Sequence, residues 1–218
     1  IQVAAGMFHS LVLLETGELV TWGVGARGRL GHGNEKTSFQ PKILSWDATN
    51  TGSEVVAANT SQEHKVAIST ERQDDGEISL FDKSELRDQA KNSAGSDSNM
   101  ENPYQVAQIT CGAMHSFART NGGLLFGWGC GANGQLGFVL PGSHYCWIPT
   151  ELKFGHRIVK HVCAGREHTL AVTTSEEFWS WGRGTEGQLG NGRMADQFTP
   201  SLLPDMTPVV SFSAGEVH

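Results

Sequence analysis

Residues 22–31 read WGVGARGRLG, and nearly the same phrase returns as WGCGANGQLG at 128–137 and as WGRGTEGQLG at 181–190. Each copy contains the spacing G-x-G-x-x-G, which also occurs in loops that hold the phosphates of a nucleotide. A dinucleotide site needs an apolar helical pattern directly after these glycines, and no copy is followed by one. Recurrence at three places therefore indicates a structural repeat, in which glycine supplies the positive φ of a turn.

A second phrase, which carries a histidine, precedes each glycine phrase. It reads AAGMFHSLVL from Ala4, TCGAMHSFAR from Thr110 and CAGREHTLAV from Cys163, and a weaker copy, TSQEHKVAIS, begins at Thr60. The repeated histidines are His9, His64, His115, His168 and His218. Their spacing defines a unit of about fifty residues.

Five segments follow from this spacing. We predict a first repeat unit at 1–54, a degenerate second unit at 55–105 with an acidic segment at 82–102, a third unit at 106–157, a fourth unit at 158–209, and the start of a fifth unit at 210–218.

Each unit has the pattern of short strands joined by tight turns. A stretch of branched apolar residues follows the histidine, a polar turn such as ETGE or TNGG comes next, and a second apolar stretch ends in Trp-Gly. A proline stands about twenty residues beyond the tryptophan, at Pro41, Pro149 and Pro200. This pattern and period predict an all-β fold with one four-stranded antiparallel sheet per unit, arranged as the blades of a β-propeller.

The pattern AGxxHS…GxxxxWGxGxxGQLGxG…P resembles the repeat of the regulator of chromosome condensation family, and the resemblance extends over essentially the whole chain. Members of that family fold as seven-bladed propellers, so the resemblance implies four repeat units of an expected seven. Because four units cannot close such a ring, we expect this chain to be part of a longer protein, with the remaining blades in the parent chain or complex.

Histidine is the residue type that most invites a search for catalysis here. Five of the nine histidines share one repeat position, and we interpret them as structural groups that form hydrogen bonds between strands. The other four, His32, His144, His156 and His161, show no metalloprotease spacing, and the chain has no nucleophile elbow and no P-loop lysine. The sequence therefore predicts no catalytic residue, no cofactor and no metal site.

The overall charge and apolar pattern limit the partners that we expect. The formal net charge is -7 and the pI is about 5.7, so no general basic field is available for direct binding of nucleic acid. No apolar run approaches the roughly 20 residues that span a bilayer, so we expect no membrane insertion. The four cysteines are interpreted as reduced thiols in or near the core of an intracellular protein, cytoplasmic or nuclear, with metal binding or a disulfide as the alternatives.

The second unit departs from the repeat. Acidic or amide side chains replace its turn glycines and lone leucine. Residues 71–101 hold nine carboxylates and four basic groups, so this stretch carries a net charge of -5 out of the whole chain's -7. This segment is interpreted either as a solvated, degenerate blade or as an element that binds a partner. The candidate partner-binding residues are Asp82, Glu85, Arg87, Asp88, Asp97 and Glu101.

Two functions of different classes are consistent with the sequence. The first is a non-enzymatic scaffold whose loops bind protein partners. The second, implied by the resemblance, is a guanine-nucleotide exchange factor for a small Ran-like GTPase. The family also includes ubiquitin-ligase modules, ciliary scaffolds and a plant ultraviolet-B photoreceptor, but the clustered G-W-R-H-T phrases of that receptor are absent from this sequence.

Overall fold

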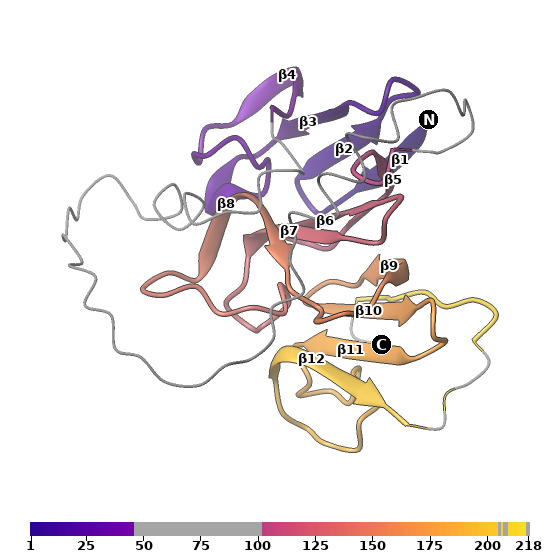
Figure 1. Cartoon of the computed structure of the whole chain (residues 1–218). Helices are drawn as coiled ribbons and strands as arrows, with labels where there is room; N and C mark the ends of the chain where they lie inside the picture. The colour runs from indigo at the N-terminus through magenta and orange to yellow at the C-terminus, as the bar shows by residue number, and fades with distance from the viewer. Residues whose placement is uncertain (46–101, 205, 207–208, 217–218) are drawn as a thin grey trace, which may run out of the picture. The chain divides into compact units, whose positions relative to one another are not determined.

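The computed structural model of the protein describes residues 1–45, 102–204, 206 and 209–216. All of these residues belong to one compact unit of the chain, which comprises residues 1–61 and 102–218. They form three four-stranded antiparallel sheets, each with its strands in sequence order (Figure 1). The predicted fold class, all-β propeller blades, is confirmed by these sheets.

The three sheets come from the predicted first, third and fourth repeat units, and we call them the first, second and third sheets. The first contains β1 (Gln2–Ala5), β2 (His9–Leu13), β3 (Leu19–Gly23) and β4 (Ser38–Ile43), with a short 3-10 helix, η1 (Ala26–Gly28), between β3 and β4. The second contains β5 (Val106–Cys111), β6 (His115–Thr120), β7 (Leu125–Cys130) and β8 (Tyr145–Leu152). The third contains β9 (Val159–Ala164), β10 (His168–Thr173), β11 (Phe178–Gly182) and β12 (Gln197–Leu203).

Strand register brings the two repeated phrases to the same end of each sheet. In the first sheet His9 lies opposite Gly23, and Gly23 lies opposite Ser38. The turn before β2 and the glycine loop after β3 therefore meet, and the amide of Val24 donates to the carbonyl of Phe8 at 2.8 Å. The same register recurs in the other two sheets. We call this end of the three sheets the turn face.

Glycine is required in the turn-face loops for two physical reasons. The third glycine of the phrase has φ of +72° at Gly28 and +82° at Gly134, a conformation that strains any residue with a side chain. At Gly25 the limit is space, because an added Cβ would lie 2.0 Å from the carbonyl oxygen of Lys36. The interpretation of these glycines as a structural turn agrees with both observations.

The repeated histidines join neighbouring sheets. The Nε2 atom of His9 lies 2.8 Å from the hydroxyl oxygen of Ser116 in the second sheet. The Nε2 atom of His115 lies 3.2 Å from the hydroxyl oxygen of Thr169 in the third sheet. Both rings are buried. Both contacts agree with the interpretation of these histidines as structural groups that form hydrogen bonds between strands, and in each case the two strands belong to neighbouring sheets.

The repeated tryptophans make a second kind of contact between sheets. The indole N–H of Trp128 donates to the carbonyl of Arg29 in the preceding sheet, and that of Trp181 donates to the carbonyl of Gln135, each at 3.0 Å. Both tryptophans are fully buried, whereas Trp22 of the first sheet is half-buried. The glycine loops of the first and second sheets thus each supply a carbonyl acceptor to the sheet that follows.

A glutamine makes the third contact between sheets. The side chain of Gln2 donates to the carbonyl of Ala107 at 2.7 Å and accepts from the amide of Ile109 at 3.2 Å. Gln108 holds Val162 in the same way, donating to its carbonyl at 2.9 Å and accepting from its amide at 3.2 Å. These glutamines stand four residues before the repeat glycine in their units, a signal that was present in the sequence.

The first and second sheets are direct neighbours, although their sequences lie in the predicted first and third units. The three contacts that join them are the same three that join the second sheet to the third. One continuous core cluster contains buried side chains from all three sheets, including Leu11, Phe117 and Trp181. The predicted second unit, 55–105, falls almost wholly on residues 46–101, which lie outside the described residues.

This direct contact leads to a prediction about the acidic segment. Hydrogen bonds from Gln2, His9 and Trp128 join the first sheet directly to the second, so we expect deletion of residues 83–101 to leave the three sheets intact. The far-UV circular dichroism spectrum and the urea midpoint should match those of the whole chain. Loss of the cooperative urea transition in the deletion variant would show that the segment is a structural edge of a blade.

Candidate functional site

The residues that the sequence singled out for partner binding, Asp82, Glu85, Arg87, Asp88, Asp97 and Glu101, lie outside the described residues. The site is therefore built from the described part of the turn face.

His9 and His115, two buried histidines of the turn face, are structural and neutral at physiological pH. Burial, together with the charge of Arg29, lowers the pKa of His9 to about 4. Burial, with smaller contributions from His9 and His168, lowers the pKa of His115 to about 3. Because both rings are buried, with Nε2 bonded to Ser116 or Thr169, neither is accessible to a substrate.

The cysteines are equally unsuited to chemistry at the surface. Cys130 and Cys146 are buried, Cys111 and Cys163 are half-buried, and no disulfide joins any two of these four described cysteines. Burial raises the pKa of Cys111 to about 12, so its thiol stays protonated at neutral pH. Their position in or near the core agrees with the sequence interpretation.

Two further observations concern the described residues alone. Within them no three His, Cys, Asp or Glu side chains gather closely enough to hold a metal ion. None of the helices found there has the length and apolar character needed to cross a bilayer.

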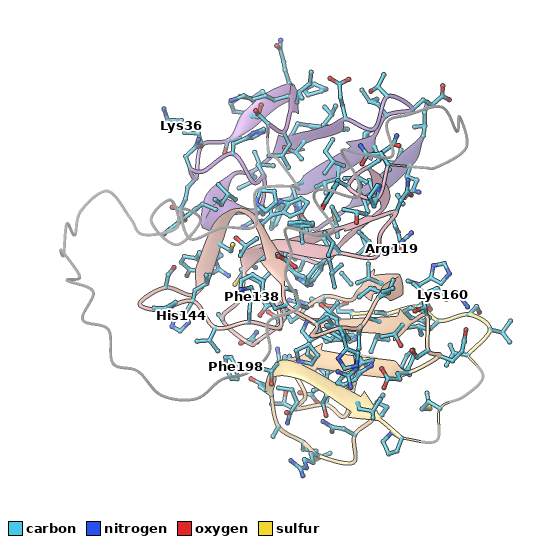
Figure 2. The ribbon with its side chains drawn as sticks, in the orientation of Figure 1. Lys36, Arg119, Phe138, His144, Lys160 and Phe198 are labelled. Atoms are coloured by element: carbon cyan, nitrogen blue, oxygen red, sulfur yellow. The ribbon has the colours of Figure 1, made fainter. Side chains whose placement is uncertain are left out.

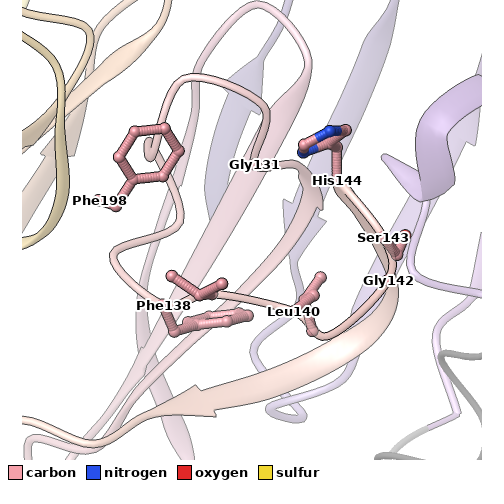
Figure 3. A pocket seen from close by; sticks show the side chains of 8 residues that line it. Gly131, Phe138, Leu140, Gly142, Ser143, His144 and Phe198 are labelled. Atoms are coloured by element: carbon pink, nitrogen blue, oxygen red, sulfur yellow. The ribbon is translucent and has the colours of Figure 1, made fainter.

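An apolar pocket of about 360 Å³ opens at the glycine loop of the second sheet. It is lined by Gly131, Phe138, Val139, Leu140, Gly142, Ser143, His144 and Phe198. Figure 2 labels Phe138, His144 and Phe198 on the whole fold, and Figure 3 shows the side chains of Phe138, Leu140, His144 and Phe198 arranged around the pocket. Phe198 comes from β12, so the pocket is built by two neighbouring sheets.

The local sequence explains why the pocket lies at this loop. After the shared Leu-Gly, the second sheet's loop continues FVLPG at 138–142, where the other two loops continue HGNEK and NGRMA. Phe138 and Leu140 pack against the core cluster. Val139 between them cannot point the same way and remains 69% exposed. A bridge between Leu140 and Ser143 closes the loop.

An aromatic residue completes the pocket from the neighbouring sheet. Phe198 stands two residues before the repeat proline, as Phe39 and Trp147 do in the other units. The glycine loop of the preceding sheet covers this position: a Cβ on Gly134 would lie 2.7 Å from the Cα of Phe198. Phe198 is still 45% exposed, and Phe39 is 93% exposed. This aromatic position was missed by the sequence reasoning, although its spacing from the proline is constant.

The rim of the turn face differs from sheet to sheet, while the buried contacts are repeated. The first sheet presents Met7, Phe8 and Val24 to solvent. The corresponding side chains of the third sheet are charged and paired, with Arg183 2.8 Å from Glu167. The repeat thus carries a constant interior and a variable rim.

Comparison with known proteins settles the family. The Regulator of chromosome condensation (RCC1) repeat matches residues 16–68, 122–172 and 177–218, and a second form of that repeat matches 1–29, 106–135 and 159–188. The chain belongs to the RCC1 repeat family. The resemblance proposed from the sequence is confirmed, and the three described sheets are RCC1 blades.

Its relatives include proteins of several classes. The chain is 34% identical over 210 residues to the human E3 ubiquitin-protein ligase HERC2, covering 92% of this chain and 4% of that protein. It is 32% identical over 210 residues to the ultraviolet-B receptor UVR8 of Arabidopsis thaliana, covering 92% of this chain and 45% of that protein. The chain therefore spans less than half the length of each of these two relatives.

Solved RCC1 propellers share the fold. Prp20p from Saccharomyces cerevisiae superposes with a TM-score of 0.65 at 17% identity, over 99% of this chain and 41% of that one. Yeast RCC1 (Prp20) in its complex with Kap60 gives a TM-score of 0.63 at 18% identity, over 99% of this chain and 40% of that one. At this level of identity the likeness supports the propeller fold and no particular activity.

Proposed function

We propose that the chain is a protein-interaction scaffold that binds its partners at the turn face and supplies no chemistry of its own. One observation carries the proposal: the repeated polar side chains are used in bonds between blades, whereas the exposed rim residues differ from blade to blade. A rigid array with a variable rim is the arrangement that binding loops on a scaffold require.

The apolar pocket is the part of this face that best fits a protein partner. Its volume of about 360 Å³ can hold one or two large side chains of an inserted segment. It is rimmed by Val139 and Phe198, whose exposed carbon surface would be removed from water on binding. Anchors of this kind carry a large share of the binding energy in protein interfaces.

The test compares partner capture by three forms of the tagged chain. We expect Val139→Asp, which puts a charge on the lip of the pocket, to lose the proteins that the unchanged chain retains in quantitative affinity capture. Phe39→Asp is the matched control, because Phe39 shares the repeat position of Phe198 but lies away from the pocket. Equal retention of the captured proteins by all three forms would show that the pocket is not part of the interface.

Nucleotide exchange is the second candidate, because Prp20p has been described with its binding to Gsp1p and histones. The chain is mixed with a panel of small GTPases loaded with fluorescent GDP, and release is followed over time. A scaffold without exchange activity leaves the release rate unchanged for every GTPase. Acceleration by a large factor for one of them would favour the exchange factor instead.

The proposal includes the setting in which the scaffold works. We place it in the cytoplasm or nucleus, bound to protein partners and to the remaining repeats of a longer chain or complex. Direct binding of nucleic acid is not part of the proposal, because the formal net charge of the chain is -7.

A further inference from the structure

Two arginines on the turn face of the first sheet lack the carboxylate partners that charged residues have elsewhere on this face. The guanidinium of Arg27 donates to the sulfur of Met114 at 2.7 Å and lies 5.8 Å from the ring centre of Tyr145. The side chain of Arg29 donates from Nε to the carbonyl of Ala26 at 2.8 Å. Within the described residues, neither guanidinium forms an ion pair with a carboxylate.

Arg29 is the more unusual of the two. It is only 4% exposed, and its Nη1 atom is buried without a hydrogen-bond partner in the described part of the chain. Burial, and then the charge of Arg27, lowers the pKa of its guanidinium. The charges of Cys130 and Glu35 oppose this lowering in part, but neither group forms an ion pair with Arg29, and a buried cation without a direct partner is costly.

The other two repeats have glutamine at this position, and they show what the fold needs there. Gln135 accepts from the amide of Asn133 at 2.8 Å, and Gln188 accepts from the amide of Glu186 at 2.9 Å. An arginine cannot accept this hydrogen bond. In the first sheet the acceptor comes from another residue.

That substitute acceptor is Glu35, whose carboxylate accepts from the backbone amide of Arg27 at 2.9 Å. The loop therefore keeps its hydrogen bond while position 29 holds a cation. The carboxylate of Glu35 is bonded to the backbone, and although its charge raises the pKa of Arg29 it forms no ion pair with either guanidinium.

Apolar side chains lie beside the two arginines. The Cζ atom of Arg29 is 6.0 Å from the ring centre of Phe8, and the amide of Val24 is bonded to the carbonyl of Phe8. Met7, Phe8 and Val24 are all exposed. In the third sheet the corresponding residues are Arg166, Glu167 and Arg183, and its arginines are paired with Glu216 and Glu167.

We propose that Arg27 and Arg29, with Met7, Phe8 and Val24, form a docking site for an acidic segment of a partner protein that also carries an apolar side chain. The carboxylate of the segment pairs with the half-buried guanidinium of Arg27, and the buried charge of Arg29 adds to the attraction. The apolar side chain of the segment covers the three exposed residues. This inference rests on the proposed scaffold function and names the chemistry of one partner.

The probe is a fluorescein-labelled dodecapeptide of alternating Asp and Leu, and its binding to the whole chain is followed by fluorescence anisotropy. Arg27→Asn and Arg29→Gln install the residues found in the second sheet, so both variants keep side chains that this fold already accepts. We expect the double variant to bind about tenfold more weakly or worse, since each lost charged hydrogen bond is worth at least about that factor. Higher salt should weaken binding to the unchanged chain and have little effect on the double variant.

Three controls decide the outcome. The same peptide with Asn in place of Asp should lose its affinity, and Arg166→Gln with Arg183→Gln should leave affinity for the Asp peptide unchanged. Equal affinity of the Arg27/Arg29 double variant and the unchanged chain would overturn the proposal. A rise of about tenfold or more in affinity for the Asp peptide when residues 83–101 are deleted would overturn the proposal too, because the site would then bind the chain's own acidic segment. Val139→Asp leaves this site untouched, so the scaffold proposal and the acidic-segment proposal can fail separately.

Discussion

Replacing Trp128 by alanine is expected to lower the free energy of unfolding by about 4 kcal/mol, the middle of the range for truncating a buried tryptophan. The side chain is fully buried in the core cluster. Its indole also donates to the carbonyl of Arg29 in the first sheet, so the substitution opens a cavity and removes a bond between sheets. Urea denaturation followed by far-UV circular dichroism measures the loss.

The repeat provides the control for this experiment. Trp22 occupies the same position in its unit but is only half-buried, and in the described residues its indole has no hydrogen bond. We expect Trp22→Ala to cost about 1 to 2 kcal/mol, because less apolar area returns to water. Trp128→Phe keeps most of the side-chain volume but removes the N–H donor, and we expect it to lower the free energy of unfolding by about as much as Trp22→Ala. Equal losses for Trp22→Ala and Trp128→Ala would contradict the assignment of Trp128 to the interface.

Stability is also expected to fall steeply when the pH drops below about 6.5. In the folded chain the pKa of His9 is about 4 and that of His115 is about 3, against about 6.5 in an unfolded chain. Between these values the unfolded state binds more protons, so acid favours unfolding. The full stability is present above pH 6.5 and is lost as the pH falls toward 4. His9 alone should account for a loss of about 3 kcal/mol by pH 4.

The pH effect can be assigned to the buried rings by substitution. His115→Gln keeps a donor for the hydroxyl of Thr169 but removes the titrating group. We expect it to be less stable than the unchanged chain at pH 7.5 and to lose less stability between pH 6.5 and 4. His156→Gln, at an exposed position, is the matched control and should be as stable as the unchanged chain at pH 7.5. Parallel pH profiles for His115→Gln and the unchanged chain would exclude the buried ring as the cause.

Much of the fold was predictable because the interior repeats. Three copies of WGxGxxGxLG reveal a period, and the strand and turn residues between them identify a four-stranded sheet. The same repetition indicates a structural role for the histidines. A residue that must meet an identical neighbour has to recur, so architectural residues leave a signal in a single sequence.

The candidate site was harder to predict because it depends on residues that do not recur. The phrase FVLPG at 138–142 has no copy in the other two glycine loops, and Arg29 stands where those loops have glutamine. The sequence shows that they depart from the pattern. It does not show that Phe138 and Phe198, from two sheets, line one pocket, or that Glu35 accepts the hydrogen bond that a glutamine accepts in the other sheets. Spatial order was hidden as well, since sequence order places another unit between the first and second sheets.

The bonds between sheets have a direction. Each sheet offers a histidine ring and a loop carbonyl on one flank, and a hydroxyl and an indole on the other. The two described joints use the same four kinds of group, so the second sheet, which takes part in both, fits its neighbours on its two flanks through one kind of joint. The joint between the first and second sheets keeps this polarity although the two sheets come from the predicted first and third units.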